Sequence, residues 1–251
     1  MPRLARVERA GTYVLLGDLL HEHHLPELPR SKEFNTTTLF MTPPEAGALL
    51  DILLTPPVQT YVEWGSGGST ELVSWLLLAA VLPRRSTRAV SVESSEKWTQ
   101  HLRSRSSLVR RAEAEGLMLL LASSYGPQTM YGHPANTTRG QVVDPWVLAG
   151  AARYVRAPFN VPSLPSIDVA LVDGRFRVAC ALEVLKHATS ATRLLMHDYG
   201  KSRQRAEYAR VLKFYKMERQ VDSLAIFTPR ADAMPPRWMQ TAIGLTRGPP
   251  R

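Results

Sequence analysis

The chain has 251 residues, which suits one domain with an extension or at most two small domains. Hydrophobic residues make up 44% of it and charged residues 21%, as in globular proteins with a sizeable core. The longest apolar stretch, residues 72–82, is about half of the roughly 20 residues that cross a bilayer. Its single cysteine, Cys180, excludes an intramolecular disulfide and a thiolate-cluster zinc site. The net charge of +9 permits binding to nucleic acid without requiring it.

Residues 1–38 are predicted to be an N-terminal extension of uncertain order, and the main domain is expected over residues 39–251. The spacing of Arg3, Arg6 and Arg9 keeps a mitochondrial address open. Glu8 and the short apolar patch that follows favour an intracellular, cytoplasmic protein.

A helix is predicted at the start of the main domain. Thr42-Pro43-Pro44-Glu45 has the spacing of a capping box with proline at the first helical position. An apolar run follows, so the helix is expected to begin here and to end before Pro56.

A glycine-rich turn comes after the first expected strand. Gly65 and Gly67 follow Tyr61-Val62-Glu63-Trp64, and an apolar run begins at Leu72. A strand, a glycine turn and a helix together place backbone N–H groups and a helix N-terminus beside a bound ligand. We expect both glycines to adopt unusual backbone dihedrals and to let a ligand approach the main chain.

Two residues around this turn distinguish between nucleotide ligands. Thr70 stands where the third glycine of a dinucleotide fingerprint closes the helix against the strand. Glu63 would repel an incoming pyrophosphate and would attract a cationic ligand instead. Both features disfavour NAD, so an NAD-dependent oxidoreductase is the weaker alternative.

Glu63-x-Gly65-x-Gly67 resembles the first motif of class I S-adenosylmethionine-dependent methyltransferases, an acidic residue followed by Gly-x-Gly. The third glycine of the family motif is Ser69 here, and a serine also serves as a helix N-cap. The resemblance implies S-adenosylmethionine as the cofactor. The residues predicted to bind it at this turn are Glu63, Gly65, Ser66, Gly67 and Ser69.

A second element supports the resemblance. The β-rich run Arg88–Glu93 ends in an acid 26 positions after Gly67. In a βαβ unit the end of the second strand lies beside the ribose, where a carboxylate accepts both sugar hydroxyls. Glu93 is therefore the predicted ribose ligand. The competing interpretation is a glycine-rich turn in an α/β domain that binds nothing.

The rest of the chain continues the alternation of strands and helices. Its predicted elements are a polar helix at 95–115, a strand at 117–122 that is apolar without alternation and so buried on both faces, an insertion at about 123–165, a strand at 167–172, a helix at 178–187, a strand at 193–199, a helix at 204–214 and strands at 216–221 and 224–228. The insertion is long enough for a lid or a substrate-binding segment, with Tyr125, Tyr131, His133 and Trp146 as its candidate contacts.

These elements predict an α/β fold. Repeated βα units favour a parallel sheet covered by helices, and two strands joined by a short turn must be antiparallel. We therefore predict a Rossmann-like three-layer sandwich, with a mainly parallel sheet and a C-terminal antiparallel hairpin. The methyltransferase resemblance implies the same arrangement over roughly residues 42–229.

The predicted catalytic residues follow the fourth and fifth strands, because ligands in open α/β sheets bind outside the carboxyl ends of the strands. His197 or Asp198 is the predicted base that takes a proton from the acceptor. Asp173 would orient the acceptor or the methionine ammonium. Arg175 would grip an acidic acceptor with two parallel hydrogen bonds.

The same turns also resemble catechol-type O-methyltransferases, in which acids after the fourth and fifth strands hold a divalent ion. Tyr199 replaces the family's asparagine after Asp198. A divalent metal is therefore not favoured, and no metal ligand is assigned.

The sequence thus predicts an S-adenosylmethionine-dependent methyltransferase, with a small-molecule or protein acceptor slightly favoured over RNA and no membrane partner. The alternative is an inactive methyltransferase-like module for the assembly of an RNA–protein particle, which the basic charge would suit. An RNA partner would be contacted through its phosphates by Arg175, Arg177, Lys201, Arg203 and Arg205.

Overall fold

A computed structural model describes residues 13–23, 25, 38–55, 58–84, 87–129, 132–135, 137–138, 141–142, 144–161, 164, 166–200 and 205–233. Among these residues, no helix combines the length and the apolar character needed to cross a membrane. The predictions made for Arg3, Arg6, Arg9, Tyr131, Lys201 and Arg203 lie outside the described residues, as does the Arg205 side chain.

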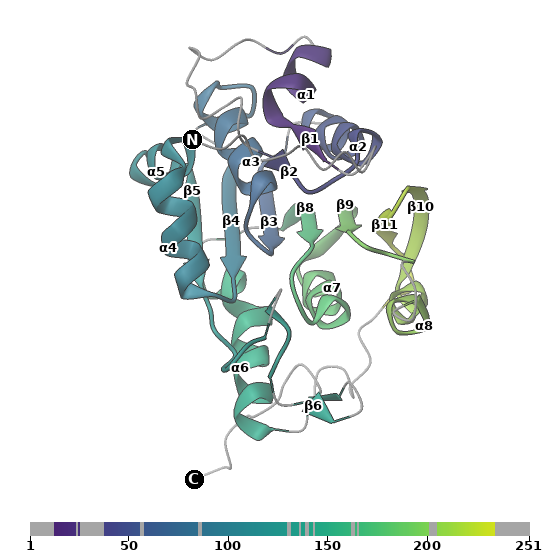
Figure 1. Cartoon of the computed structure of the whole chain (residues 1–251). Helices are drawn as coiled ribbons and strands as arrows, with labels where there is room; N and C mark the ends of the chain where they lie inside the picture. Colours follow the sequence, from purple (N-terminus) through teal and green to yellow (C-terminus); the bar gives the residue numbers. More distant parts are fainter. Residues whose placement is uncertain are drawn as a thin grey trace.

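A seven-stranded sheet forms the middle of the molecule, in the order β10-β11-β9-β8-β3-β4-β5 (Figure 1). Its strands are β3 (Thr60–Trp64), β4 (Arg88–Glu93), β5 (Met118–Ala122), β8 (Ile167–Val172), β9 (Ala188–Met196), β10 (Tyr215–Val221) and β11 (Leu224–Pro229). The strands from β5 to β9 pair in parallel, whereas β11 runs antiparallel to β9 and β10 antiparallel to β11. The predicted sheet and its C-terminal hairpin are confirmed.

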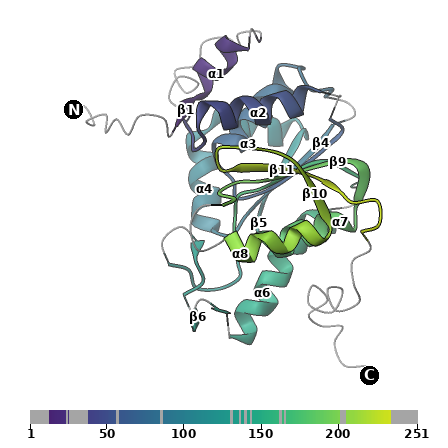
Figure 2. The same cartoon turned by 90° about the vertical axis from the view of Figure 1, so that its right-hand side faces the viewer.

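Helices cover both faces of the sheet, as Figure 2 shows from the side. Tyr61 belongs to the core on the face of α1, α2, α3 and α5, and Val62 to the core on the face of α6 and α7. Successive residues of a strand point to opposite faces, so each strand contributes to both cores. The bounds are α1 (Leu16–Glu22), α2 (Pro43–Leu54), α3 (Gly68–Leu78), α5 (Ser107–Ala114), α6 (Pro145–Arg156) and α7 (Arg177–Leu185). The three-layer sandwich is confirmed.

Helix α2 begins and ends as predicted. Thr42 is its N-cap, and its backbone N–H donates to Oε2 of Glu45 at 2.8 Å. The backbone N–H of Glu45 donates to Oγ1 of Thr42 at 3.4 Å, which completes the capping box. Glu45 is thereby fixed at the start of the helix, and the same Oε2 atom also lies at the site described below.

The structure corrects two predicted elements between β4 and β5. The polar helix is two helices, α4 (Glu96–Arg105) and α5, because Ser106 is extended between them and its hydroxyl accepts from the backbone N–H of Val109 at 3.3 Å. Strand β5 is an edge strand, so Leu119 is 38% exposed and the strand is not buried on both faces. An apolar run without alternation does not identify a central strand.

The insertion contains a packed helix as well as loops. Helix α6 begins after Asp144, whose carboxylate accepts from the backbone N–H of Trp146 at 2.8 Å. A Cβ at Gly150 would lie 2.5 Å from the Cα of Tyr125. Helix α6 therefore packs closely on the segment that follows β5. A short hairpin, β6 (Thr137–Thr138) and β7 (Gln141–Val142), precedes it. The lid role of this segment stays a prediction.

Part of the predicted N-terminal extension packs on the main domain. Strand β1 (Val14–Leu15) pairs with β2 (Thr38–Leu39), and Leu16, Leu19 and Leu20 of α1 are buried in the core on the α2 and α3 face. A Cβ at Gly68 would clash with the backbone of Thr38. Glycine at this position lets β2 lie directly against the start of α3.

The remaining helical segments lie between β9 and β10 in the chain. Helix α8 (Arg205–Tyr208) continues into the 3-10 helix Ala209–Lys213, where a single helix over 204–214 was predicted. Cys180 is fully buried in α7.

Candidate functional site

The two glycines of the β3–α3 turn have different roles. Gly65 has a φ of +96°, and a Cβ there would lie 2.7 Å from the backbone nitrogen of Gly174 in the turn after β8. Only glycine allows this approach of the two turns. Gly67 has an extended φ of 179°, and a Cβ there would meet no heavy atom of the described residues within 4 Å. The expected unusual dihedral is confirmed at Gly65 and wrong at Gly67.

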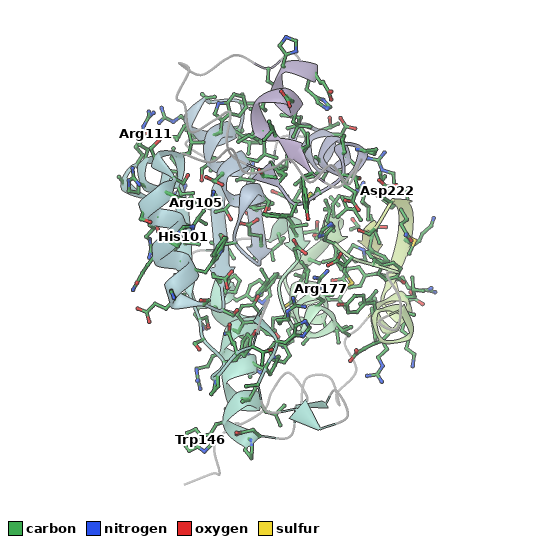
Figure 3. The ribbon with its side chains drawn as sticks, in the orientation of Figure 1. His101, Arg105, Arg111, Trp146, Arg177 and Asp222 are labelled. Carbon is green, nitrogen blue, oxygen red and sulfur yellow. The ribbon has the colours of Figure 1, made fainter. Side chains whose placement is uncertain are left out.

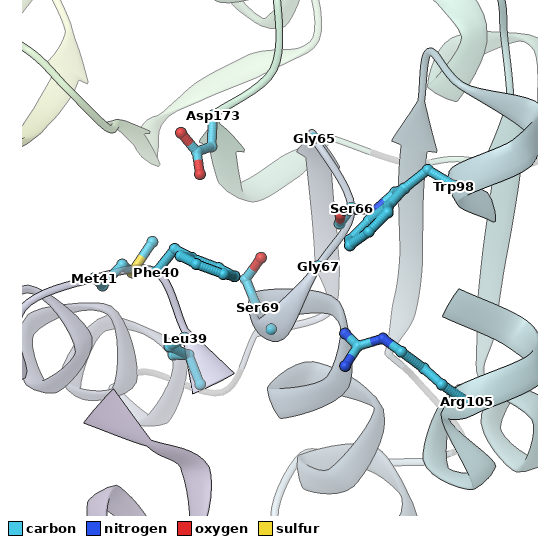
Figure 4. A pocket seen from close by; sticks show the side chains of 11 residues that line it. Leu39, Phe40, Met41, Gly65, Ser66, Gly67, Ser69, Trp98, Arg105 and Asp173 are labelled. Carbon is cyan, nitrogen blue, oxygen red and sulfur yellow. Dashed lines mark hydrogen bonds between the residues drawn. The ribbon is translucent and has the colours of Figure 1, made fainter. Parts of the chain in front are cut away.

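A pocket opens at this turn, between the ends of β3 and β8 (Figure 4). It lies where the chain order of the parallel strands reverses, the usual place for a ligand in an open α/β sheet. Asp173 and Arg105 stand at opposite ends of the view in Figure 4, with the glycine turn between them. The lining residues are Leu39, Phe40, Met41, Gly65, Ser66, Gly67, Gly68, Ser69, Trp98, Arg105 and Asp173.

Helix α4 provides one wall of this pocket. Trp98 donates its indole N–H to the backbone carbonyl of Ser66 at 2.8 Å, and the Arg105 guanidinium lies 5.9 Å from the Trp98 ring centroid. Arg105 also pairs with Glu71 of α3 at 2.8 Å. These contacts hold α4 against the glycine turn and α3.

Glu63 lies inside the protein, beneath the turn. Its side chain has no exposed surface and accepts hydrogen bonds from four hydroxyls, among them Ser91 at 2.6 Å and Tyr61 at 2.7 Å. Ser69 donates at 2.8 Å, and Thr70 is the fourth donor. Burial raises the pKa of Glu63, and the four donors oppose that rise. The contacts of Glu63 are with β3, β4 and the first turn of α3, and its direct contact with a cofactor stays a prediction.

Ser69 is not the N-cap of α3, contrary to the expectation from sequence. The helix begins at Gly68, with Gly67 in the capping position, and the Gly67 N–H donates to the hydroxyl of Thr70 at 2.8 Å. The Ser69 hydroxyl is directed to Glu63 instead. The buried carboxylate therefore determines the conformation of the turn through two consecutive hydroxyl residues.

Glu93 lies at the end of β4, next to the glycine turn. One carboxylate oxygen accepts from the backbone N–H of Ser66 at 3.2 Å, and the other accepts from the backbone N–H of Ser95 at 2.9 Å. Burial raises the pKa of Glu93, although these bonds and the Ser94 hydroxyl favour the charged form. The structure thus brings Glu93 beside the turn, as the sequence predicted, and ribose binding stays a prediction.

The polar residues after β8 and β9 form a buried ion-pair cluster. His197 is 6% exposed, with Nδ1 at 2.9 Å from Oδ1 of Asp173 and Nε2 at 3.4 Å from Oε2 of Glu45. Glu45 also accepts from the backbone N–H of Ser223 at 2.7 Å and from its hydroxyl at 2.6 Å. The imidazole of His197 therefore joins helix α2 to the end of β8.

The two carboxylates determine the charge of His197. Burial alone lowers the pKa of His197, but its hydrogen bond to Asp173, its contact with Glu45 and the charges of Asp173 and Asp198 raise it to about 10. Burial alone raises the pKa of Glu45, but His197, Ser223 and Thr42 lower it to about 2. The raised pKa favours the imidazolium form of His197 at neutral pH, which disfavours a role as general base there, and the catalytic assignment of His197 stays a prediction.

Arg177 occupies the centre of the second half of the cluster, in the interior of the molecule (Figure 3). It is 4% exposed, and one terminal nitrogen lies 3.0 Å from Oδ2 of Asp198 and 3.3 Å from Oδ1 of Asp173. Asp198 has a φ of +55° and so does Phe176, the residue before Arg177. Such backbone strain in non-glycine residues is concentrated at functional sites.

Arg177 is unsuited to the RNA phosphate contacts predicted from the sequence, because its guanidinium is buried and paired. Arg175 is half-buried at the start of the same turn. Burial and the charges of Arg175 and Arg177 lower the pKa of His133 from the insertion. The site therefore places Arg175 on the side of the insertion, and its contact with an acceptor stays a prediction.

The fold and this site can be compared with known proteins. No protein-family model matches the sequence, and no curated protein matches it. A solved methyltransferase-like protein from Silicibacter pomeroyi DSS-3 is 27% identical, with a TM-score of 0.60, over 82% of this chain and 97% of that chain. The resemblance to class I S-adenosylmethionine-dependent methyltransferases that the sequence predicted is confirmed by this match.

Two further solved methyltransferases match with lower scores. The precorrin-6Y C5,15-methyltransferase from Geobacter metallireducens GS-15 is 12% identical, over 76% of this chain and 89% of that chain, with a TM-score of 0.46. TrmK of M. capricolum, solved with S-adenosyl-homocysteine, is 12% identical, over 73% and 68%, with a TM-score of 0.38. At these scores the likeness carries nothing about the reaction of this protein.

Sequence inspection missed two residues of this site, Glu45 and Arg105. Glu45 was recognised only as a capping residue, whereas Arg177 was predicted to contact phosphates and not to pair with acids. Trp98 and Arg105 line the pocket from α4. The acid at the third helical position of a capping box is the one local signal for any of them. It does not show that the capping carboxylate of Glu45 also contacts His197.

Proposed function

We propose that this protein is an S-adenosylmethionine-dependent methyltransferase. The observation that carries the proposal is the open space at Gly67, a cradle where an added Cβ would meet no described atom within 4 Å, in a pocket that Asp173 lines and whose Ser66 backbone contacts Glu93. A ligand that carries an ammonium and a sulfonium suits a pocket with an acid at its end. S-adenosylmethionine would supply an activated methyl group there.

The residues around the cradle have separate roles in this proposal. Ser66 and Gly67 offer backbone to the cofactor, and Glu93 accepts the ribose hydroxyls. Glu63 acts through Ser69 and Thr70, because its four hydrogen bonds hold the turn in shape. Gly65 lets the β3 and β8 turns approach, which brings Asp173 to the cofactor.

Asp173 and Asp198 are the groups proposed to act on the acceptor. Their side chains are 30% and 32% exposed, whereas His197 is buried as an imidazolium. A carboxylate can accept the acceptor's proton or orient its lone pair. His197 is a positioning residue, since it holds Asp173 from the side of Glu45.

The acceptor is proposed to be a small molecule or a protein, with RNA as the less favoured choice. Arg177 is withdrawn from the surface by its two ion pairs, which weakens the basic patch expected for phosphates. Arg175 stays the candidate for one acidic group of a small acceptor.

Calorimetry with S-adenosylmethionine, S-adenosylhomocysteine and NAD tests the proposal. We expect heat with the first two and none with NAD. Gly67→Val should abolish binding, while its melting temperature stays near that of the wild type because nothing described fills the space. Glu93→Ala should weaken binding by about 1.5–3 kcal/mol, the scale of a hydrogen bond to a charged group.

Folded wild-type protein that gives no heat with either sulfur ligand would exclude the enzyme and leave the inactive assembly module. Unchanged affinity in folded Gly67→Val would place the ligand elsewhere.

A further inference from the structure

We infer that Arg177 takes the place of a divalent cation between Asp173 and Asp198, so that this site holds its two acids without a metal. The inference concerns the site of the proposed function, but cation binding and cofactor binding are measured separately, so either can fail alone. A catechol-type metal centre does not fit the side chains present.

The cluster has the outline of a metal site. One ligand atom each from Asp173, His197 and Asp198 lies within 4.8 Å of the others. The carboxylate and imidazole groups suit several divalent ions. The positions of these three ligand atoms alone would therefore predict a metal site. Their ion pairs with Arg177 and with each other argue against one.

Both carboxylates already have a cation. The same terminal nitrogen of Arg177 lies 3.0 Å from Oδ2 of Asp198 and 3.3 Å from Oδ1 of Asp173. The Nδ1 atom of His197 lies 2.9 Å from that same Oδ1 atom. A divalent ion here would have to displace the guanidinium and separate the imidazole from Asp173.

The guanidinium is fixed on every side that the structure describes. Its Nε donates to the carbonyl of Gly174 at 3.0 Å, and its terminal nitrogens donate to the carbonyls of Asp173, at 3.1 Å, and of His197. Its centre lies 5.8 Å from the ring centroid of Tyr208. Arg177 is thus built into both strand-end turns and cannot swing aside without breaking backbone contacts.

The charges of the cluster lead to the same conclusion. Glu45, Asp173 and Asp198 are the acids, and Arg177 and His197 are the cations among them. A metal ion placed beside a buried guanidinium would be repelled by it, because screening is weak in the interior. The guanidinium instead neutralises and positions the two acids, whose side chains stay 30% and 32% exposed.

Titration with Mn²⁺, followed by the loss of its electron paramagnetic resonance signal, tests this inference. We expect no saturable binding to wild-type protein or to Arg177→Lys, the variant that keeps the charge. Arg177→Gln removes the cation and keeps polar contacts, so it should gain saturable Mn²⁺ binding. Its affinity should exceed any weak, non-saturable binding of the wild type by at least about tenfold. The double variant with Asp198→Asn should lose that gain.

Two results would overturn the inference. The first is saturable Mn²⁺ binding by wild-type protein that Asp198→Asn abolishes. The second is a folded Arg177→Gln variant, judged by circular dichroism, that gains no Mn²⁺ affinity. If Arg177→Gln does not fold, the wild-type and Asp198→Asn titrations decide alone, with no saturable binding in either supporting the inference. Calorimetry with S-adenosylhomocysteine on the wild type reports separately on the proposed function.

Discussion

The two sides of the candidate pocket are built in different ways. On the β3–α3 side, one buried carboxylate, Glu63, is surrounded by four neutral hydroxyl donors. On the side of the β8 and β9 turns, acids and cations alternate through Glu45, His197, Asp173 and Arg177. The first side shapes a backbone cradle, whereas the second holds charged groups in place by other charged groups.

This difference has consequences for stability. A neutral hydroxyl can be removed from Glu63 while three donors remain, so single losses are small. Removing one member of a buried ion-pair cluster leaves another charge uncompensated, which costs far more. The charged side should therefore be the more sensitive to mutation.

The largest effect is expected for Arg177→Met. Asp173 and Asp198 would lose their shared cation, so the free energy of unfolding should fall by about 3–5 kcal/mol, nearer the lower figure because both acids are partly exposed. Urea unfolding measures this. Arg193→Met is the control, since its pair with Glu218 at 3.0 Å is exposed and should contribute at most about 1 kcal/mol. Equal losses in the two variants would contradict the buried role.

The glycine side is tested by a pair of variants. Gly65→Ala should destabilise by about 1–3 kcal/mol, because its φ of +96° is strained for alanine and its Cβ would meet the Gly174 backbone. Gly67→Ala should change stability by less than about 0.5 kcal/mol, as at sites without such features. Thermal unfolding of both variants is the measurement. A reversed order would show that the turn is described wrongly.

A smaller loss is expected from Tyr61→Phe, which removes one of the four donors to Glu63. The free energy of unfolding should fall by about 1 kcal/mol, the ordinary value of one hydrogen bond. Chemical denaturation is again suitable. A loss as large as that of Arg177→Met would remove the contrast between the two sides.

The smallest expected effect is the pH dependence of stability that the charged side contributes. The pKa of His197 is raised from 6.5 to about 10, so its contribution is fully present below pH 6.5 and is lost as the pH rises through 10. Urea midpoints should therefore fall over this interval in wild-type protein. His197→Gln should flatten the decline, and His101→Gln, at an exposed position, should not. A decline that persists in His197→Gln would assign it to another group.

Much of the fold could be predicted from local patterns. The capping box at Thr42, the glycines after β3 and the short turn at Asp222 each act within a few residues, so the chain itself reveals them. The direction of the last two strands follows from the length of their connection. The end of β8 was placed correctly, whereas β9 spans Ala188–Met196 and ends three residues before the predicted end at 199; Asp173 and His197 still meet.

Burial and pairing could not be predicted in the same way. The backbone N–H of Ser223 donates to Glu45 across 178 positions of sequence, and β5 became an edge strand because no further strand pairs with it among the described residues. Arg177 looked like a surface charge because α7 alone does not show which turns close over it.

By itself, then, the sequence determined the α/β alternation, the glycine cradle and the strand ends at which acids collect. Only the tertiary structure decided that Glu63 supports the turn from inside, that His197 is an imidazolium between two acids and that Arg177 fills the centre of the charged side. The physical reason is one of range. Periodicity, caps and turns act between neighbours in the chain, whereas desolvation and charge pairing depend on segments that only folding brings together.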